Sequence, residues 1–228
     1  RRPRPPPPPP QPPPPPRPPR PPPAPTTDDE YRDDVAATLR FLVEEVALDP
    51  LPEPWLLASS TAGAALAARL GLPLAFAHHI RPDNTLAALG HYRAHFAPSP
   101  WCASPRVLVC VETICAETPE EAARLSGPMD VVKAGLLKGH SEAPFPSPEE
   151  ASVHPFTAED RQALAAFRSQ QAYGTPATVV RRLAEVADAT GADELMLATP
   201  VYALAARLRS YELVKEHAAA PSATAPQH

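Results

Sequence analysis

A run of small and polar residues separates two apolar segments of the sequence: Ser59, Ser60, Thr61, Ala62 and Gly63. A short apolar run precedes them and an alanine-rich segment follows, which predicts a turn between a strand and a helix. Free amide groups and the helix dipole favour an anion at such a position, and small side chains permit close approach. The turn is therefore a candidate phosphate site. Ordinary capping of the helix by serine and threonine is the simpler interpretation of the same residues.

Two adjacent histidines, His78 and His79, end the next apolar run. In a parallel barrel the carboxyl ends of the strands face the active site. Because side chains alternate along a strand, only one of the two can point inward. The alternative for either residue is a hydrogen-bonded structural histidine.

A second histidine pair, His91 and His95, has the i, i+4 spacing of metal ligands. It lacks the glutamate of the H-E-x-x-H motif and an obvious third ligand, so we interpret it as a solvated helix face and predict no metal site. The three cysteines, Cys102, Cys110 and Cys115, have neither zinc nor disulfide spacing and are expected to be buried as small apolar residues.

One carboxylate, Glu112, lies inside an otherwise apolar strand segment. It belongs on the polar or inner side of that strand, where burial would raise its pKa, or it points outward to solvent. No general acid or base is predicted, so the catalytic residues stay unknown.

The segments around these residues alternate between strand and helix. Apolar runs predict strands at 55–58, 74–77, 106–116 and 194–199, with helices between them and a first helix at 28–48 that opens at a Thr-Thr-Asp-Asp cap. Residues 135–155 have no clear period and predict an irregular insertion. Four strands alternating with helices predict an α/β fold with a parallel sheet, either doubly wound or part of a (β/α)8 barrel.

The first 27 residues differ sharply in composition from the rest. Half of the chain's 36 prolines lie in the first 25 residues, together with five arginines, which predicts a disordered or polyproline II tail. The whole chain carries −5, so residues 26–228 carry −10, which argues against a nucleic-acid surface. No apolar run is long enough for a membrane span and no secretory signal is present, so a cytoplasmic location is expected. A second short disordered tail is predicted at 218–228.

The amino-acid sequences of several segments resemble those of the luciferase-like flavin-dependent monooxygenases. That family carries W-L-L-G-S-S, a small-residue helix, G-L-P and a strand ending in F-A-H-H, in this order. The matching segments here are WLLASSTAGAALAARLGLPLAFAHH at 55–79, GTPATV at 174–179, ADELMLATPVY at 192–202 and RLRSYEL at 207–213. The resemblance covers residues 28–217 and implies the C-terminal half of a (β/α)8 barrel, whose earlier strands and N-terminal E-H-H segment are absent from this sequence.

This resemblance implies reduced FMN as cofactor, or a deazaflavin coenzyme as in some relatives, and oxidation of a small organic substrate. It implies that Ser59, Ser60 and Gly63 line the flavin phosphate and that Thr199–Tyr202 lies at the barrel mouth near the flavin. Thr61 of the same turn and the strand-end histidines His78 and His79 are further candidate cofactor-binding residues. Ala58 replaces the family's usual glycine, and we expect it to narrow the approach of the ligand. A flavin reductase is a possible partner.

Three hypotheses remain open from the sequence. The chain is an active enzyme, either as a homo-oligomer or with a partner that completes the barrel. Alternatively it is a catalytically inactive half-barrel whose open edges favour aggregation or pairing. As a third possibility, it is an interaction protein whose Arg-Pro tail binds partners through polyproline II.

Overall fold

The computed structural model describes residues 27–45, 52–140 and 144–219. The predicted tails at 1–27 and 218–228 fall almost entirely outside these ranges, as does the expected end of the first helix near Leu48. The chain divides into two compact units, Arg1–Glu45 and Val46–His228.

The first unit is described through one helix, α1 (Asp28–Glu44). Thr27 caps it, as the sequence predicts, by accepting a hydrogen bond at its side chain from the Glu30 amide at 3.2 Å. Glu30 returns the contact by accepting from the Thr27 amide at 2.8 Å. This capping box satisfies two of the donors that every helix start leaves unpaired.

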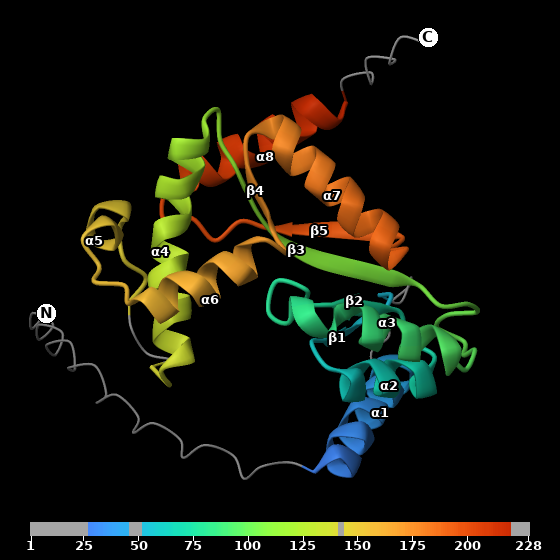
Figure 1. Cartoon of the computed structure of the whole chain (residues 1–228). Helices are drawn as coiled ribbons and strands as arrows, with labels where there is room; N and C mark the ends of the chain where they lie inside the picture. Colours follow the sequence, from blue (N-terminus) through green and yellow to red (C-terminus); the bar gives the residue numbers. More distant parts are fainter. Residues whose placement is uncertain (1–26, 46–51, 141–143, 220–228) are drawn as a thin grey trace, which may run out of the picture. The chain divides into compact units, whose positions relative to one another are not determined.

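The second unit contains a parallel sheet of five strands (Figure 1): β1 (Leu56–Ala58), β2 (Leu74–Phe76), β3 (Val107–Cys115), β4 (Ala172–Gly174) and β5 (Glu194–Ala198). Strand β3 occupies the centre, because it pairs with β2, β4 and β5, whereas β1 pairs with β2. The α/β class with a parallel sheet is confirmed.

One strand, β4, was not predicted from the sequence. β2 pairs with β3 only as far as Val109, and β4 then takes over the pairing at Thr113 to Cys115. The side chain of Gln171 joins the two segments, because it accepts from the Glu112 amide at 2.9 Å and donates to the His78 carbonyl at 3.3 Å. The four-strand count from the sequence is therefore wrong by one short strand.

Helices connect the strands in the predicted order: α2 (Thr61–Leu70), η1 (Pro82–Asn84), α3 (Thr85–Ala94), α4 (Pro119–Leu137), α5 (Pro148–Ser152), α6 (Ala158–Arg168), α7 (Pro176–Thr190) and α8 (Leu204–Ala218). Gly71 ends α2 with a φ of 62°, and a Cβ at this position would lie 2.4 Å from the Ala97 carbonyl oxygen. Only glycine fits both constraints.

The two faces of the sheet are covered differently. In-register residues share a face, and Leu56, Leu74 and Val107 are all buried on the face that packs against helices such as α2 and α7. On the opposite face Leu57 is 66% exposed and Met196 is 51% exposed. The apolar composition of the run at 55–58 alone suggests burial on both faces, but the described residues cover only one face of β1.

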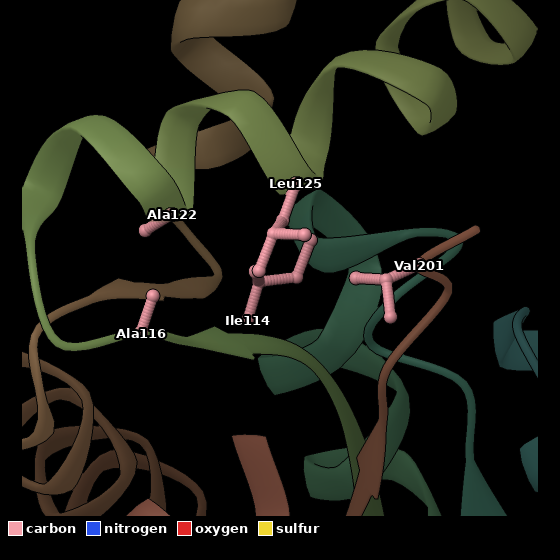
Figure 2. Packing of buried hydrophobic residues seen from close by; sticks show 5 residues of the cluster. All are labelled: Ile114, Ala116, Ala122, Leu125 and Val201. Atoms are coloured by element: carbon pink, nitrogen blue, oxygen red, sulfur yellow. The ribbon is translucent and has the colours of Figure 1, made fainter. Parts of the chain in front are cut away.

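At the carboxyl end of β3 the second face is covered by α4. Figure 2 shows the cluster that joins them: Ile114 and Ala116 at the strand end, Ala122 and Leu125 from α4, and Val201 after β5. Because Glu112 lies two residues before Ile114, it points to the same side of the sheet. The inner side predicted for Glu112 is thus the side that α4 covers.

The region 135–155 is more regular than predicted. Gly135–Leu137 forms the last turn of α4, and Ser147 caps the short helix α5 with a capping box to Glu150. Sequence periodicity misses α5 because five residues do not show a repeat of 3.6. Residues 141–143 lie outside the described part of the chain.

Tyr92 of α3 is fully buried, and its hydroxyl forms hydrogen bonds with backbone groups just before β2 and β3. It donates to the Leu72 carbonyl at 2.9 Å and accepts from the Arg106 amide at 3.2 Å. We expect Tyr92→Phe to lower the free energy of unfolding by about 1–3 kcal/mol, because both groups lose a partner. Urea unfolding measures this, with Tyr202→Phe, an exposed tyrosine, as control.

The effect of Tyr92→Phe on the free energy of unfolding should also depend on pH. Burial raises the pKa of Tyr92 to about 12. The folded chain therefore keeps the phenol proton where the unfolded chain loses it, so this stabilisation is complete below pH ~10 and is lost as the pH rises toward 12. The difference between wild type and Tyr92→Phe should shrink over that interval. A difference that grows above pH 10 would contradict this assignment.

Candidate functional site

The predicted phosphate turn follows β1 and opens α2. Ser60 is the N-cap, and its hydroxyl accepts from the Gly63 amide at 3.1 Å. The Thr61 and Ala62 amides donate to no protein acceptor among the described residues. The turn is accessible, with Ser60 and Ala62 exposed and Ser59, Thr61 and Gly63 half-buried. The cap occupies only one of the first-turn donors, so it leaves the Thr61 and Ala62 amides available to an acceptor.

A single side chain, Asn84, ties this turn to the segment after β2. Its amide nitrogen donates to the Ser59 carbonyl at 3.4 Å, and its Oδ1 accepts from the Thr61 hydroxyl at 3.3 Å. The carboxyl ends of β1 and β2 are thereby fixed beside each other. Sequence reasoning did not single out Asn84, because a lone asparagine before a helix reads as a cap.

The glycine of the turn, Gly63, has a packing role. A Cβ on Gly63 would lie 2.7 Å from the Ala58 Cβ, so the glycine allows the helix to sit on the strand. Ala58 is buried on this helix-covered face. The expectation that Ala58 narrows the approach of a ligand is therefore wrong, because its methyl group points away from the open face.

His78 and His79 face different surroundings, as alternation requires. His78 is buried, and its Nδ1 and Nε2 each lie 2.8 Å from a partner, the Thr85 hydroxyl and the Gln170 carbonyl. Burial lowers the pKa of His78. With both ring nitrogens engaged, His78 joins the segments before α3 and β4 and matches the structural alternative.

His79 instead lines a cavity of about 400 Å3, which we call the α4–α6 cavity. Its other lining residues come mainly from α4 and α6 and are largely apolar: Ile80, Glu112, Met129, Lys133, Leu136, Leu137, Ala163, Leu164 and Phe167. A cavity of this size, with few polar groups in apolar walls, is typical of small-molecule sites.

A buried ionic cluster forms the polar part of this cavity. Glu112 is 1% exposed, and its Oε1 lies 2.5 Å from the Lys133 ammonium and accepts a hydrogen bond from the Tyr173 hydroxyl. The ammonium also sits 3.8 Å from the centre of the Phe167 ring. The carboxylate is thus paired and buried, whereas the sequence left burial and exposure open.

Burial shifts the pKa values of both hydrogen-bond partners of Glu112, Lys133 and Tyr173. It lowers the pKa of Lys133, against the attraction of the Glu112 carboxylate, and it raises the pKa of Tyr173, with the nearby negative charge acting in the same direction. The tyrosine therefore stays protonated and donates. A second pair, Arg168 and Asp130, lies beside the cluster, with the guanidinium 5.9 Å from the Tyr173 ring.

Lys133 and Tyr173 were not predicted as site residues. Lys133 follows Met129 by four residues and precedes Leu136 and Leu137, so it occupies the apolar stripe of α4. A lysine in such a stripe is the one signal that the sequence offers. Tyr173 lies on β4, which was not predicted.

The remaining candidates fall outside this cavity. His91 and His95 stack at 4.1 Å between ring centres, and the ring of His95 contacts the His91 carbonyl. Among the described residues no group of three His, Cys, Asp or Glu side chains could hold a metal. All three cysteines are free and buried, as predicted. Thr199 is buried and donates to the Thr113 carbonyl, whereas Tyr202 is exposed.

The sequence model of the luciferase-like monooxygenases matches residues 10–194, most of the chain. The chain belongs to the luciferase-like monooxygenase family. The match begins inside the proline-rich segment and extends through α7 to the start of β5. The resemblance inferred from the motifs is thereby confirmed.

Curated relatives of this luciferase-like chain are about one third identical to it over the aligned residues. The uncharacterized protein YceB of Bacillus subtilis is 33% identical over 165 residues, which are 72% of this chain and 50% of that protein. A luciferase-like monooxygenase of Escherichia coli K12 is 33% identical over 162 residues, 71% of this chain and 48% of that protein. The chain spans about half the length of these relatives.

Solved structures support the fold assignment. The crystal structure of apo-MsnO8 superposes with a TM-score of 0.71 at 32% identity, covering 84% of this chain and 61% of that chain. The monooxygenase RslO1 from Streptomyces bottropensis superposes with a TM-score of 0.59 at 19% identity and shows the fold alone. The sheet therefore corresponds to part of a luciferase-like barrel. No helix in the described ranges is long and apolar enough to cross a membrane.

The buried pair makes a direct prediction about stability. Lys133→Met leaves the Glu112 carboxylate buried without its cation, so we expect the free energy of unfolding to fall by about 3–5 kcal/mol. Adding Glu112→Leu should recover much of this loss, because the unpaired charge is then removed. Urea unfolding of the single and double variants measures both effects. Lys215→Met, at an exposed lysine of α8, is the control, and an equal loss in both lysine variants would refute the pairing.

Proposed function

We propose that this chain carries out flavin-dependent oxidation of a small organic substrate, with reduced FMN held at the Ser59–Gly63 turn. The observation that carries the proposal is the pair of open amides, Thr61 and Ala62, at the positive end of α2. Family membership points to flavin chemistry, and the turn offers what a flavin phosphate needs.

The turn fits an anionic group in three respects. Ser60 stays exposed while it caps the helix, so its oxygen is already oriented toward the first turn. Ser59 follows the last residue of β1 and has a half-buried side chain. The Asn84 contacts hold the backbone of the turn in place. The donors are thereby fixed before a ligand binds, which reduces the ordering cost of binding.

In this proposal the protein positions the reactants, and bound reduced flavin supplies the electrons with which the substrate is oxygenated or a hydride is moved. The α4–α6 cavity opens at the same carboxyl edge of the sheet as the phosphate turn. His79 follows β2 and lines that cavity, so His79 is proposed to stand at the substrate side, whereas His78 orders the backbone around it. A deazaflavin coenzyme also carries a phosphate and suits the turn on the same grounds.

Completion of the barrel is part of the proposal. The chain matches about half of its curated relatives, and the open face of its sheet exposes Leu57 and Met196. We propose that a complementing barrel half, or a second copy, covers this face in the active assembly. A flavin reductase as electron source and a cytosolic setting remain parts of the same proposal.

The phosphate assignment is tested by a charge placed in the turn without loss of the cap. Aspartate and asparagine both cap helices well, so Ser60→Asp and Ser60→Asn differ chiefly in charge. We expect FMN to bind at least about tenfold more weakly to Ser60→Asp than to Ser60→Asn, because the new carboxylate repels the phosphate. Flavin fluorescence and visible absorbance during titration measure both affinities.

Riboflavin, which lacks the phosphate, provides the matched ligand control. Its affinity should be the same for the two Ser60 variants. Equal FMN affinities in the two variants would place the phosphate elsewhere. Absence of FMN binding to the folded wild-type chain, alone and with a complementing half, would reject the flavin proposal itself.

A further inference from the structure

The α4–α6 cavity has an apolar rim and a polar floor. Ile80, Leu136 and Leu137 line it although 56%, 51% and 67% of their surfaces are exposed. Apolar side chains this exposed around an opening favour an apolar ligand, because a ligand there removes them from water. The floor contains the Glu112–Lys133 pair, whose charges cancel.

One acceptor on this floor has no partner. Both hydrogen bonds to the Glu112 side chain, from Lys133 and from Tyr173, end on Oε1. Within the described residues no donor reaches Oε2, although the residue is 99% buried and lines the cavity. Oε2 is not among the fully enclosed unpartnered atoms of the described residues, so the cavity leaves it accessible, and a ligand that brings a donor to it is favoured.

A second acceptor stands beside the first. His79 Nδ1 lies 3.4 Å from the Cys110 carbonyl oxygen, which can only accept, so Nδ1 carries the proton. In the neutral ring Nε2 is then an acceptor. Glu112 Oε2 and His79 Nε2 therefore both require a donor. Among the described lining residues the only ammonium or guanidinium group is that of Lys133, which Glu112 and Phe167 already engage.

We propose that the α4–α6 cavity binds the substrate of this chain, and that the substrate is a small, neutral, mainly apolar molecule with one hydroxyl or N–H donor, which Glu112 Oε2 receives. A charged ligand is disfavoured, because the existing pair is already neutral and the lining residues that the structure describes offer no second counter-ion. Glu112 is thus the residue that selects the ligand by its donor. The term substrate rests on the proposed function, whereas the binding site does not.

A methionine on the cavity lining can report ligand binding at this site by NMR. The chain contains two methionines: Met129 lines the cavity, and Met196 lies on β5 outside the lining. In protein labelled with 13C at the methionine methyl groups, Met129 reports binding and Met196 serves as internal control, with Met129→Leu used for assignment. The probes are 1-hexanol and its isomer 1-methoxypentane, which has the same atoms but no donor.

In the wild type, 1-hexanol should shift the Met129 signal saturably, leave Met196 unchanged, and bind about tenfold more tightly than the ether, as expected for a hydrogen bond to a charged acceptor. Glu112→Gln should reduce this preference to less than about threefold while both probes still bind. Ala163→Phe, at an exposed residue of the lining, should weaken both probes equally by filling the opening.

Each outcome decides one part of the proposal. No Met129 shift with either probe would reject the cavity as a ligand site. Equal binding of alcohol and ether to the wild type, or an unchanged preference in Glu112→Gln with a native Met196 signal, would reject selection by Glu112. Loss of the native Met196 signal in Glu112→Gln moves the comparison to the double variant Glu112→Leu, Lys133→Met, which removes the acceptor and its counter-ion together. A preference as large as in the wild type would reject selection by Glu112 there as well. FMN titration of the same samples reports separately on the phosphate turn.

Discussion

Strand β3 is the constraint on which the second unit of this chain depends. Its nine residues pair with three other strands, because β2 and β4 share one of its edges in succession and β5 occupies the other. The side chains of β3 alternate between the two faces of the sheet as a result. The valines point to the face covered by helices such as α7, and Glu112 points to the opposite face, which α4 covers. If the pairing register of β3 shifted by one residue, the Glu112 carboxylate would point to the face packed against α7, and the valines would point into the α4–α6 cavity.

The buried ion pair between Glu112 and Lys133 carries a desolvation penalty that lowers the stability of the fold. Glu112 and Lys133 are held away from water, where an apolar pair of the same size would serve stability at least as well. Their shared hydrogen bonds with Tyr173 also fix α4 relative to β4, two elements separated in the chain by α5 and α6. The cluster thereby sets the floor of the cavity, which apolar packing alone would leave less defined.

Much of the fold could be predicted from the sequence because its local signals are strong. Gly71 and Gly191 end helices, Thr27 and Thr118 begin them, and the β-branched run of β3 is long enough to identify. Strand β4 was missed because Ala172–Gly174 is too short to show a period. Ser60 and His79 could be selected as candidates because each follows from its position at the end of one strand, and their roles in a site stay predictions. Lys133 and Tyr173 meet Glu112 through tertiary contacts, which a single sequence does not reveal.

The contact between Ala58 and Gly63 has a consequence for how such sequences vary. The space between β1 and α2 admits one methyl group at this point, since a Cβ on Gly63 would lie 2.7 Å from the Ala58 Cβ but 3.6 Å from the Ala58 Cα. A chain with glycine in the strand position can therefore carry alanine in the helix position, and the reverse, but not alanine in both. The two positions should covary as an exchange of a single methyl group, so that the residue allowed at position 63 depends on the residue that the neighbouring strand carries at position 58.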